Sequence, residues 1–227
     1  MVDFSKFNSP EYRAEFERRK AEQEKQEEIE EQLRLKTCCF TGHRPDKLAG
    51  GYNWYHPENI ELGNVIKTQV VELIENYGVY RFICGGALGV DQMAFAICHK
   101  LKKTYPNLHL ILAIPFKNQD CVWKNKTDLQ RYVQQKQQAD EIIYVDELCD
   151  LRYKIDADVP KGDYHPHKMS RRNEYMVDHS QYIIAIWDGS KGGTGNCVRY
   201  AKQAIGYQRM IIRINPRRNY EVEISYS

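Results

Sequence analysis

The stretch from Arg81 to Ala94 most constrains what this chain can fold into. It reads Arg-Phe-Ile-Cys-Gly-Gly-Ala-Leu-Gly-Val-Asp-Gln-Met-Ala, an apolar run followed by closely spaced glycines and a helix-forming segment. This order predicts a buried strand that turns tightly into a helix. The first backbone amides of such a helix lack partners inside it and can bind an anion such as phosphate. The spacing matches neither the dinucleotide fingerprint nor the P-loop, so a turn that needs glycine only for packing explains it equally well.

A second stretch repeats this order about 100 residues later. Ile183 to Trp187 is apolar, glycines recur from Gly189 to Gly195, and a helical segment begins at Cys197. Two such units place both glycine-rich loops at one edge of a parallel sheet, where α/β proteins bind their ligands. Together the two loops predict a site that holds one nucleotide.

Composition limits the classes of function. A net charge of +2 at pH 7, with lysines and arginines scattered along the chain, does not form the basic stripe of a dedicated nucleic-acid binder, so a small molecule is favoured as the partner. Seven cysteines without a C-x-x-C pair or a signal peptide predict a reducing cytoplasm rather than disulfides or a zinc site. No apolar run approaches the roughly 20 residues that span a membrane. We therefore expect a cytoplasmic protein without a membrane partner.

The 227 residues divide into three expected parts. Residues 1–36 form a charged helical arm, because Glu11 to Gln32 consists mainly of Glu, Lys, Arg and Gln. Residues 37–216 form one domain, and residues 217–227 form a frayed tail. The arm is either a plain solvated leader or docks at its ends on a neighbouring subunit of a homo-oligomer. Its apolar residues are two isolated pairs, Tyr12/Phe16 and Ile29/Leu33.

Strands and helices alternate between the arm and the tail. This alternation predicts an α/β fold, a Rossmann-like three-layer sandwich with a mostly parallel sheet of about six strands. Apolar residues at helical spacing from Pro57 to Tyr77, followed by Gly78, predict a helix with its stop signal. The six expected strands lie near Thr37–Phe40, Arg81–Cys84, Leu108–Ile114, Glu141–Val145, Ile183–Trp187 and Arg209–Ile214.

Two further segments carry candidate contacts. Thr41-Gly42-His43-Arg44 ends the first strand, and Arg44 can bind a phosphate bidentately or pair with a surface carboxylate. The long stretch from Leu148 to Met169 could be a lid over the site, and we expect the helix after it to open with a serine cap at Ser170. His165 and His167 in this stretch lack a third ligand nearby, so no metal is expected.

Five motifs follow one another between Thr37 and Ile214. They are Thr-Gly-His-Arg-Pro at 41–45, Cys-Gly-Gly-Ala-Leu-Gly-Val-Asp at 84–91, Pro-Phe at 115–116, Arg-Arg-Asn-Glu-Tyr-Met-Val-Asp at 171–178 and Asp-Gly-Ser-Lys-Gly-Gly-Thr at 188–194. In this order they resemble the YpsA-like branch of the SLOG superfamily, to which the Lonely Guy phosphoribohydrolases and the DNA-processing protein DprA also belong. The resemblance implies a Rossmann-like fold that binds nucleotides or nucleotide-derived ligands.

The same resemblance bears on catalysis. Lonely Guy enzymes use an arginine from an Arg-Lys-x-x-Met stretch and a glutamate from Pro-Gly-Gly-x-Gly-Thr-x-x-Glu. Here Arg172 and Met176 match the first motif, Asn173 replaces the lysine, and the glutamate position falls on Cys197. Because cleavage of a glycosidic bond needs a carboxylate, a cysteine at this position argues against that hydrolase. Three carboxylates remain as weak catalytic candidates, and none is assigned: Asp91, Glu174 and Asp188.

We therefore expect a protein that senses or sequesters a nucleotide-derived molecule, such as an ADP-ribose-like compound or a nucleoside phosphate. A nucleotide N-glycosidase is one alternative, and a DprA-like single-stranded DNA binder or a protein-interaction scaffold is another. No cofactor is expected. Asp188 could bind a ribose hydroxyl, and Asp91 could instead cap its own helix. The expected ligand contacts are Thr41, Gly42, His43, Arg44, Gly85, Gly86, Ala87, Gly89, Asp91, Arg172, Asn173, Asp188, Gly192, Gly193, Thr194, Gly195 and Asn196.

Overall fold

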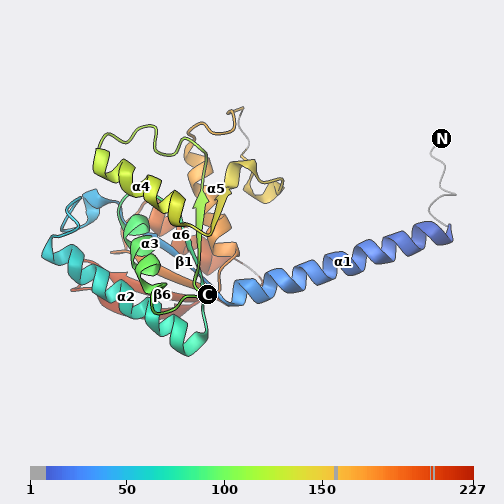
Figure 1. Cartoon of the computed structure of the whole chain (residues 1–227), viewed down its shortest axis with the longest axis horizontal. Helices are drawn as coiled ribbons and strands as arrows, with labels where there is room; N and C mark the ends of the chain where they lie inside the picture. Colours follow the sequence, from blue (N-terminus) through green and yellow to red (C-terminus); the bar gives the residue numbers. More distant parts are fainter. Residues whose placement is uncertain (1–8, 156–157, 205, 207) are drawn as a thin grey trace.

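A seven-stranded sheet forms the centre of the computed structural model, which describes residues 9–155, 158–204, 206 and 208–227 (Figure 1). The strand order is β4-β3-β2-β1-β5-β6-β7. The first six strands pair in parallel and β7 pairs antiparallel with β6, which confirms the mostly parallel sheet. The strands are β1 Thr37–Gly42, β2 Arg81–Cys84, β3 His109–Ile114, β4 Glu141–Tyr144, β5 Tyr182–Ile186, β6 Met210–Asn215 and β7 Glu221–Tyr226.

Helices cover both faces of the sheet, as the sequence predicts. Because side chains alternate along a strand, Phe40 of β1 packs in the core under α2, α3 and α4, whereas Cys39 packs in the core under α5 and α6. These two cores and the sheet between them confirm the Rossmann-like three-layer sandwich. The helices are α2 Pro57–Tyr77, α3 Val90–Leu101, α4 Lys126–Gln138, α5 Pro166–Asp178 and α6 Gly193–Gln203.

The strand order reverses at β1. Strands β2, β3 and β4 are added on one side of β1, and the chain then crosses the sheet through α5 to place β5 on the other side. In open parallel sheets, ligands bind outside the carboxyl ends of the strands at such a switch point. The carboxyl ends of β1 and β5 are therefore the first place to look for a site.

The largest differences from the sequence prediction concern the tail and the starts of α5 and α6, the last of which begins at Gly193 rather than at Cys197. The stretch expected as a frayed tail contains β7, which follows a turn whose Asn219 and Tyr220 have φ values of 48° and 57°. Non-glycine residues rarely adopt this conformation, so the hairpin carries no sequence signal. Helix α5 begins at Pro166 rather than at Ser170, and Nδ1 of its N-cap, His165, accepts a hydrogen bond from the backbone amide of His167.

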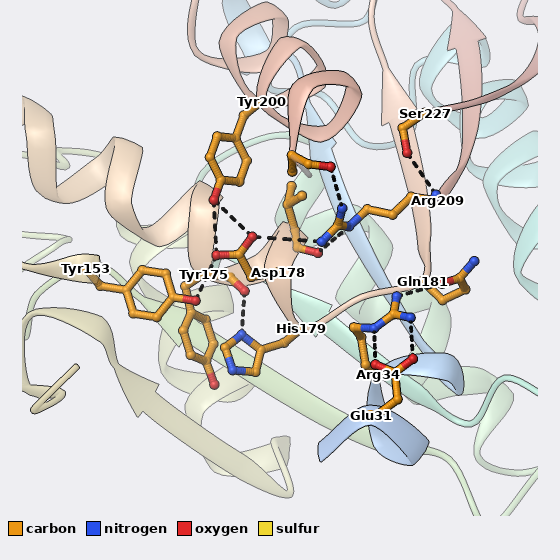
Figure 2. Close-up of polar contacts among 12 residues, drawn as sticks. Glu31, Arg34, Tyr153, Tyr175, Asp178, His179, Gln181, Tyr200, Arg209 and Ser227 are labelled. Atoms are coloured by element: carbon orange, nitrogen blue, oxygen red, sulfur yellow. Dashed lines mark hydrogen bonds and ion pairs between the residues drawn. The ribbon is translucent and has the colours of Figure 1, made fainter. Parts of the chain in front are cut away.

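The long helix α1, Pro10–Leu35, projects from the domain (Figure 1). Its end is held by Arg34, which donates to both carboxylate oxygens of Glu31 and, at 2.6 Å, to the Gln181 side chain (Figure 2). The helical arm is thus present from Pro10 onward, and residues 1–8 of the expected arm lie outside the described residues. None of the described helices combines the length and apolar character needed to cross a membrane.

Candidate ligand-binding site

A cavity of about 220 Å³ lies at the switch point, between the end of β1, the start of α3, helix α5 and the glycine-rich loop before α6. The structure brings most of the expected contact residues together there. Those that line it are Thr41, Gly42, His43, Arg44, Ala87, Asp91, Arg172, Asn173, Gly192, Gly193, Thr194 and Gly195. The expected contacts that do not line it are Gly85, Gly86, Gly89, Asp188 and Asn196.

His43 connects the two glycine-rich loops. Its backbone oxygen accepts a hydrogen bond from the Val90 amide at the start of α3, 3.3 Å away. Its Nε2 lies 3.0 Å from Oδ1 of Asp188, just before the second loop, and both side chains are at most 4% exposed. Burial lowers the pKa of His43, and the Asp188 carboxylate opposes this shift only in part. The imidazole is therefore a structural link in its neutral form.

Asp188 serves this link rather than the cavity. Its carboxylate also accepts from the Ser190 amide at 2.9 Å and pairs with Arg217 Nε at 2.8 Å. Burial raises the pKa of Asp188, but hydrogen bonds from Ser190 and His43 lower it more, so the net pKa lies below its usual range. These groups engage the Asp188 carboxylate, and Asp188 does not line the cavity.

Arg172 occupies the floor of the cavity from α5. It is only 5% exposed, its Nη1 donates to the Gly85 carbonyl at 2.5 Å, and its Nε donates to Asn173 Oδ1 at 3.0 Å. Burial lowers the pKa of this guanidinium, and the nearby Asp91 carboxylate opposes the shift. Its Nη2 makes no hydrogen bond within the described residues, so that group remains available to a ligand.

Asp91 lies beside Arg172 at the start of α3. Its Oδ2 accepts from the Ala87 amide at 3.2 Å and is 3.7 Å from Arg172 Nη1. Burial raises the pKa of Asp91, although Arg172 and Arg44 lower it in part. The expected alternative, that Asp91 caps its own helix, is wrong, because Gly89 is the N-cap of α3 and no side chain caps it. The Asp91 carboxyl group instead closes the loop before the helix and also lines the cavity.

Arg44 supplies a second guanidinium from the loop after β1. It is half-buried, and its side chain makes no hydrogen bond or ion pair to any described residue. The expected alternative, a surface carboxylate partner, is therefore not formed within that part of the chain. A half-buried arginine without a protein partner is well placed to receive an anionic group.

The second glycine-rich loop presents a helix N-terminus to the cavity. Gly192 is the N-cap of α6 and provides no side-chain cap, so the first amides of the helix lack partners within it. A Cβ built on Gly193 meets no atom within 4 Å, which shows that this position opens into free space. The partial positive charge of the helix start and the two arginines together favour an anion.

Several lining residues were not identified from the sequence. Lys47, whose Nζ is 3.4 Å from Ser190 Oγ, and Lys191 add positive charge to the rim, and Asp46 adds a carboxylate. Lys191 lies inside the motif at 188–194 and Lys47 lies two residues after the motif at 41–45, so a search for cations in and near each loop would have found them. The lining residues missed are Phe40, Asp46, Lys47, Met169, Ser190 and Lys191.

The other candidate groups lie away from the cavity. Glu174 pairs with Arg171 at 2.6 Å on α5, and Asn196 accepts from Arg199 on α6. Cys197 is 2% exposed in the core beneath α6, where burial raises the pKa of its thiol to about 11. Cys197 is thus a buried, neutral thiol.

The stretch from Leu148 to Met169 does not form a lid over the cavity in its described part, since only Met169 lines it. Lys168 connects this stretch to the turn after β4: its Nζ pairs with the buried Asp146 at 3.0 Å and donates to the carbonyls of Pro160 and Asp163. Residues 156–157 of the stretch lie outside the described residues. Across the described chain, no three His, Cys, Asp or Glu side chains are grouped to hold a metal ion.

Comparison with known proteins agrees with this architecture. Residues 38–215 match the family model described as the YspA SLOG family. An uncharacterized SPbeta prophage-derived protein, YoqJ, from Bacillus subtilis is 44% identical over 172 residues, which is 75% of this chain and 97% of YoqJ. The UPF0398 protein BH1768 from Halalkalibacterium halodurans is 27% identical over 70% of this chain and 76% of its own length, and a UPF0398 protein from Oenococcus oeni is 25% identical over 72% and 79%. The chain belongs to the YspA SLOG family.

Proposed function

We propose that the protein binds a nucleotide or nucleotide-derived ligand, such as an ADP-ribose-like compound or a nucleoside phosphate, and senses or sequesters it without turnover. The observation that carries this proposal is the convergence of two guanidinium groups and an uncapped helix N-terminus on one cavity at the switch point of the sheet. Such groups recognise phosphate by hydrogen bonds and by charge.

The lining residues form two regions, one suited to phosphate and one suited to the other polar groups of the ligand. Arg44, Arg172 Nη2 and the amides from Gly193 onward would bind phosphate oxygens, with Lys47 and Lys191 adding attraction at the rim. Thr41 and Asn173 offer a hydroxyl and an amide to the remaining polar groups of the ligand. Membership of a family with a nucleotide-related fold supports this assignment.

The proposal that the ligand is bound without turnover is supported by the positions of the candidate carboxylates. Glu174 and Asp188 are engaged elsewhere, and the buried thiol of Cys197 carries no negative charge with which to stabilise an oxocarbenium-like transition state. A missing electrostatic group of this kind commonly lowers a rate by roughly a hundred- to a thousandfold.

Asp91 favours one alternative, a nucleotide N-glycosidase. It is the weak catalytic candidate that lines the cavity, and burial raises the pKa of its carboxyl group. A carboxyl group with a raised pKa can act as a general acid. In this alternative Asp91 would protonate the leaving base as the N-glycosidic bond breaks, a water molecule would add to C1′ of the ribose, and Arg172 would hold the ribose phosphate.

The test is to purify the protein under mild conditions, denature it with heat and identify the released small molecules by mass spectrometry. We expect a phosphate-containing nucleotide derivative with the unmodified protein and much less of it with Arg44→Gln. The matched control is Arg152→Gln, which removes an exposed arginine outside the cavity and should retain the ligand. Equal recovery from both variants would move the site elsewhere.

Single-turnover chromatography with nucleoside monophosphates, NAD and ADP-ribose separates binding from catalysis. We expect these compounds to be recovered intact. Release of free base that disappears in Asp91→Asn would replace the binder with the N-glycosidase.

A further inference from the structure

Strand β7 is an open edge of the sheet, and its exposed side chains are apolar. It pairs with β6 on one side and with no described strand on the other. Val222, Ile224 and Tyr226 are 37%, 56% and 58% exposed and lie on one face of the strand, because they alternate along it. Strand β4, at the other edge, is only four residues long. Natural edge strands avoid pairing with other chains by being short or by carrying lysine or proline, and β7, with six residues, carries neither.

The same three residues point their backbone polar groups away from β6. The Ser227 amide donates to the Arg209 carbonyl at 3.1 Å, and the Arg209 amide donates to Ser227 Oγ at 2.9 Å (Figure 2), so these two residues face each other. Residues that face the neighbouring strand and residues that face away alternate along an antiparallel ladder. Every second residue counted back from Ser227 therefore faces β6. The three exposed apolar residues each present one N–H and one C=O to the open edge, where no other described strand accepts or donates.

A second copy of β7 can complete this edge. Two antiparallel copies related by a two-fold axis at Ile224 place Ile224 opposite its own symmetry mate and Val222 opposite the partner's Tyr226. All the outward N–H and C=O groups then exchange hydrogen bonds, and the apolar side chains meet on one face. On the other face Glu223 lies opposite the partner's Ser225, so like charges are not paired directly.

The neighbouring registers fit less well. An axis at Glu223 would bring two Glu223 carboxylates directly opposite each other, where like charges are destabilising. An axis at Ser225 would leave Val222 opposite a position outside Glu221–Tyr226. A shift by a single residue in one chain would place outward groups opposite inward ones. The sequence of β7 is therefore complementary to itself in one antiparallel register.

We propose that the protein forms a two-fold dimer by antiparallel pairing of β7 with β7 of a second copy, centred on Ile224. The two seven-stranded sheets become one continuous sheet, and the contact is isologous and closes on itself. Strand β7 lies outside residues 38–215, so this surface lies outside the part of the chain that matches the family model. None of the residues that line the candidate ligand site belongs to β7.

Sedimentation velocity over roughly 1 to 200 µM tests the dimer, because a contact made by one strand per chain should dissociate in the micromolar range. Ile224→Lys places two ammonium groups opposite each other and should raise the dissociation constant at least about tenfold with unchanged circular dichroism. The matched control is Ile142→Lys, which puts the same charge on β4 at a 36% exposed position and should leave the dimer intact. An unmodified chain that stays monomeric, or an Ile224 variant as dimeric as the control, would overturn the proposal.

Disulfide formation tests the register. Glu223→Cys, Ile224→Cys and Ser225→Cys would each be made in a chain whose exposed Cys121 and Cys149 are replaced by serine. Of the three, position 224 lies opposite its own symmetry mate, where the Cα atoms of a hydrogen-bonded pair are about 5.5 Å apart and within reach of a disulfide. We expect a covalent dimer under mild oxidation at position 224 and little at the other two. Faster cross-linking at 223 or 225, or equal rates at all three, would exclude the proposed pairing.

Amide hydrogen exchange locates the interface in the unmodified protein. In the dimer the outward amides of Val222, Ile224 and Tyr226 should exchange at least about tenfold more slowly than after dilution to the monomer. The amides of Glu223 and Ser225 are internal controls, because they face β6 in both states and should change little. A chain that sediments as a dimer without protecting the outward amides would have its interface elsewhere, contrary to the proposal.

Discussion

The two glycine-rich loops look alike in sequence and do different physical work in the structure. In the first loop the glycines are surrounded. A Cβ on Gly89, where φ is +89°, would lie 2.7 Å from the His43 carbonyl, and a Cβ on Gly85 would overlap the Arg172 guanidinium. In the second loop, Gly193 faces open space and, like Gly192, lines the cavity.

This difference explains which part of each loop a ligand can reach. The first loop contributes Ala87 and Asp91 to the cavity, and its glycines allow the end of β1 and Arg172 to approach closely. The second loop brings its own backbone to the cavity. A glycine-rich turn after a strand can therefore mean close packing or ligand contact, and the neighbours of the missing Cβ decide between them.

The largest effect is expected for Gly89→Ala in the first loop. Alanine would have to adopt a positive φ and would press its Cβ against the backbone of His43 and Pro45. Strained backbone of this kind and overpacking each cost about 1–3 kcal/mol, so we expect a loss of about 3 kcal/mol in the free energy of unfolding.

Urea unfolding of Gly89→Ala and of Gly193→Ala measures this contrast. The Gly193 variant should be at least as stable as the unmodified protein, because its Cβ has free space in the folded state. The substitution also lowers the conformational entropy of the unfolded chain, which favours folding. Equal losses of stability in the two variants would contradict the distinction between the loops.

A smaller effect on stability and a clear one on binding are expected for Gly193→Phe. The side chain would project into the cavity beside the first amides of α6, so the ligand would lose both space and hydrogen bonds. We expect affinity for ADP-ribose, as the calorimetric probe, to fall at least about tenfold, equivalent to 1.4 kcal/mol. The melting temperature should stay within a few degrees of that of the unmodified protein. Undiminished binding of a phosphate-bearing probe would show that the second loop does not contact it.

Much of the fold follows from local patterns in the sequence. The helical spacing of Leu62, Ile66 and Val70 predicts α2, and Gly78, whose φ is +65°, marks its end. The observed limits agree because the apolar face and the C-terminal cap are both encoded locally. Continuous apolar runs predict the parallel strands, since both of their faces are covered. β7 was missed because its turn uses Asn219 and Tyr220 in an unusual conformation and its apolar side chains remain exposed.

The candidate site was harder to predict where long-range partners decide the role of a residue. The motifs that contain Arg44 and Arg172 could be assigned to one edge of the sheet, because the topology of a parallel sheet places the loops after its strands there. By contrast, the role of Asp188 depends on His43 and Arg217, neither of which is near it in sequence. Glu174 was a candidate as a carboxylate in the same motif as Arg172, but its side chain pairs with Arg171.

The smallest expected effect concerns pH and the link between the loops. Burial lowers the pKa of His43, so below about pH 6.5 the unfolded chain takes up a proton that the folded chain resists. Stability is therefore fully present above the unfolded pKa of histidine and falls as the pH decreases through the folded pKa. The lowered pKa of Asp188 acts in the same direction at lower pH, because its protonation would remove the partner of His43.

We expect the free energy of unfolding to fall by on the order of 1 kcal/mol between pH 7.5 and pH 5.5 in urea titrations. His43→Gln should reduce that slope, because glutamine does not titrate. His179, whose pKa burial also lowers, provides the matched control at the opposite edge of the sheet. Both variants should flatten the dependence of stability on pH, but only His43→Gln should also change the affinity for ADP-ribose, since His43 lines the cavity and its side chain contacts Asp188 before the second loop, whereas His179 does not line the cavity. An equal change of affinity in both variants would contradict this assignment, because it would show that the effect does not depend on the contact between the two loops.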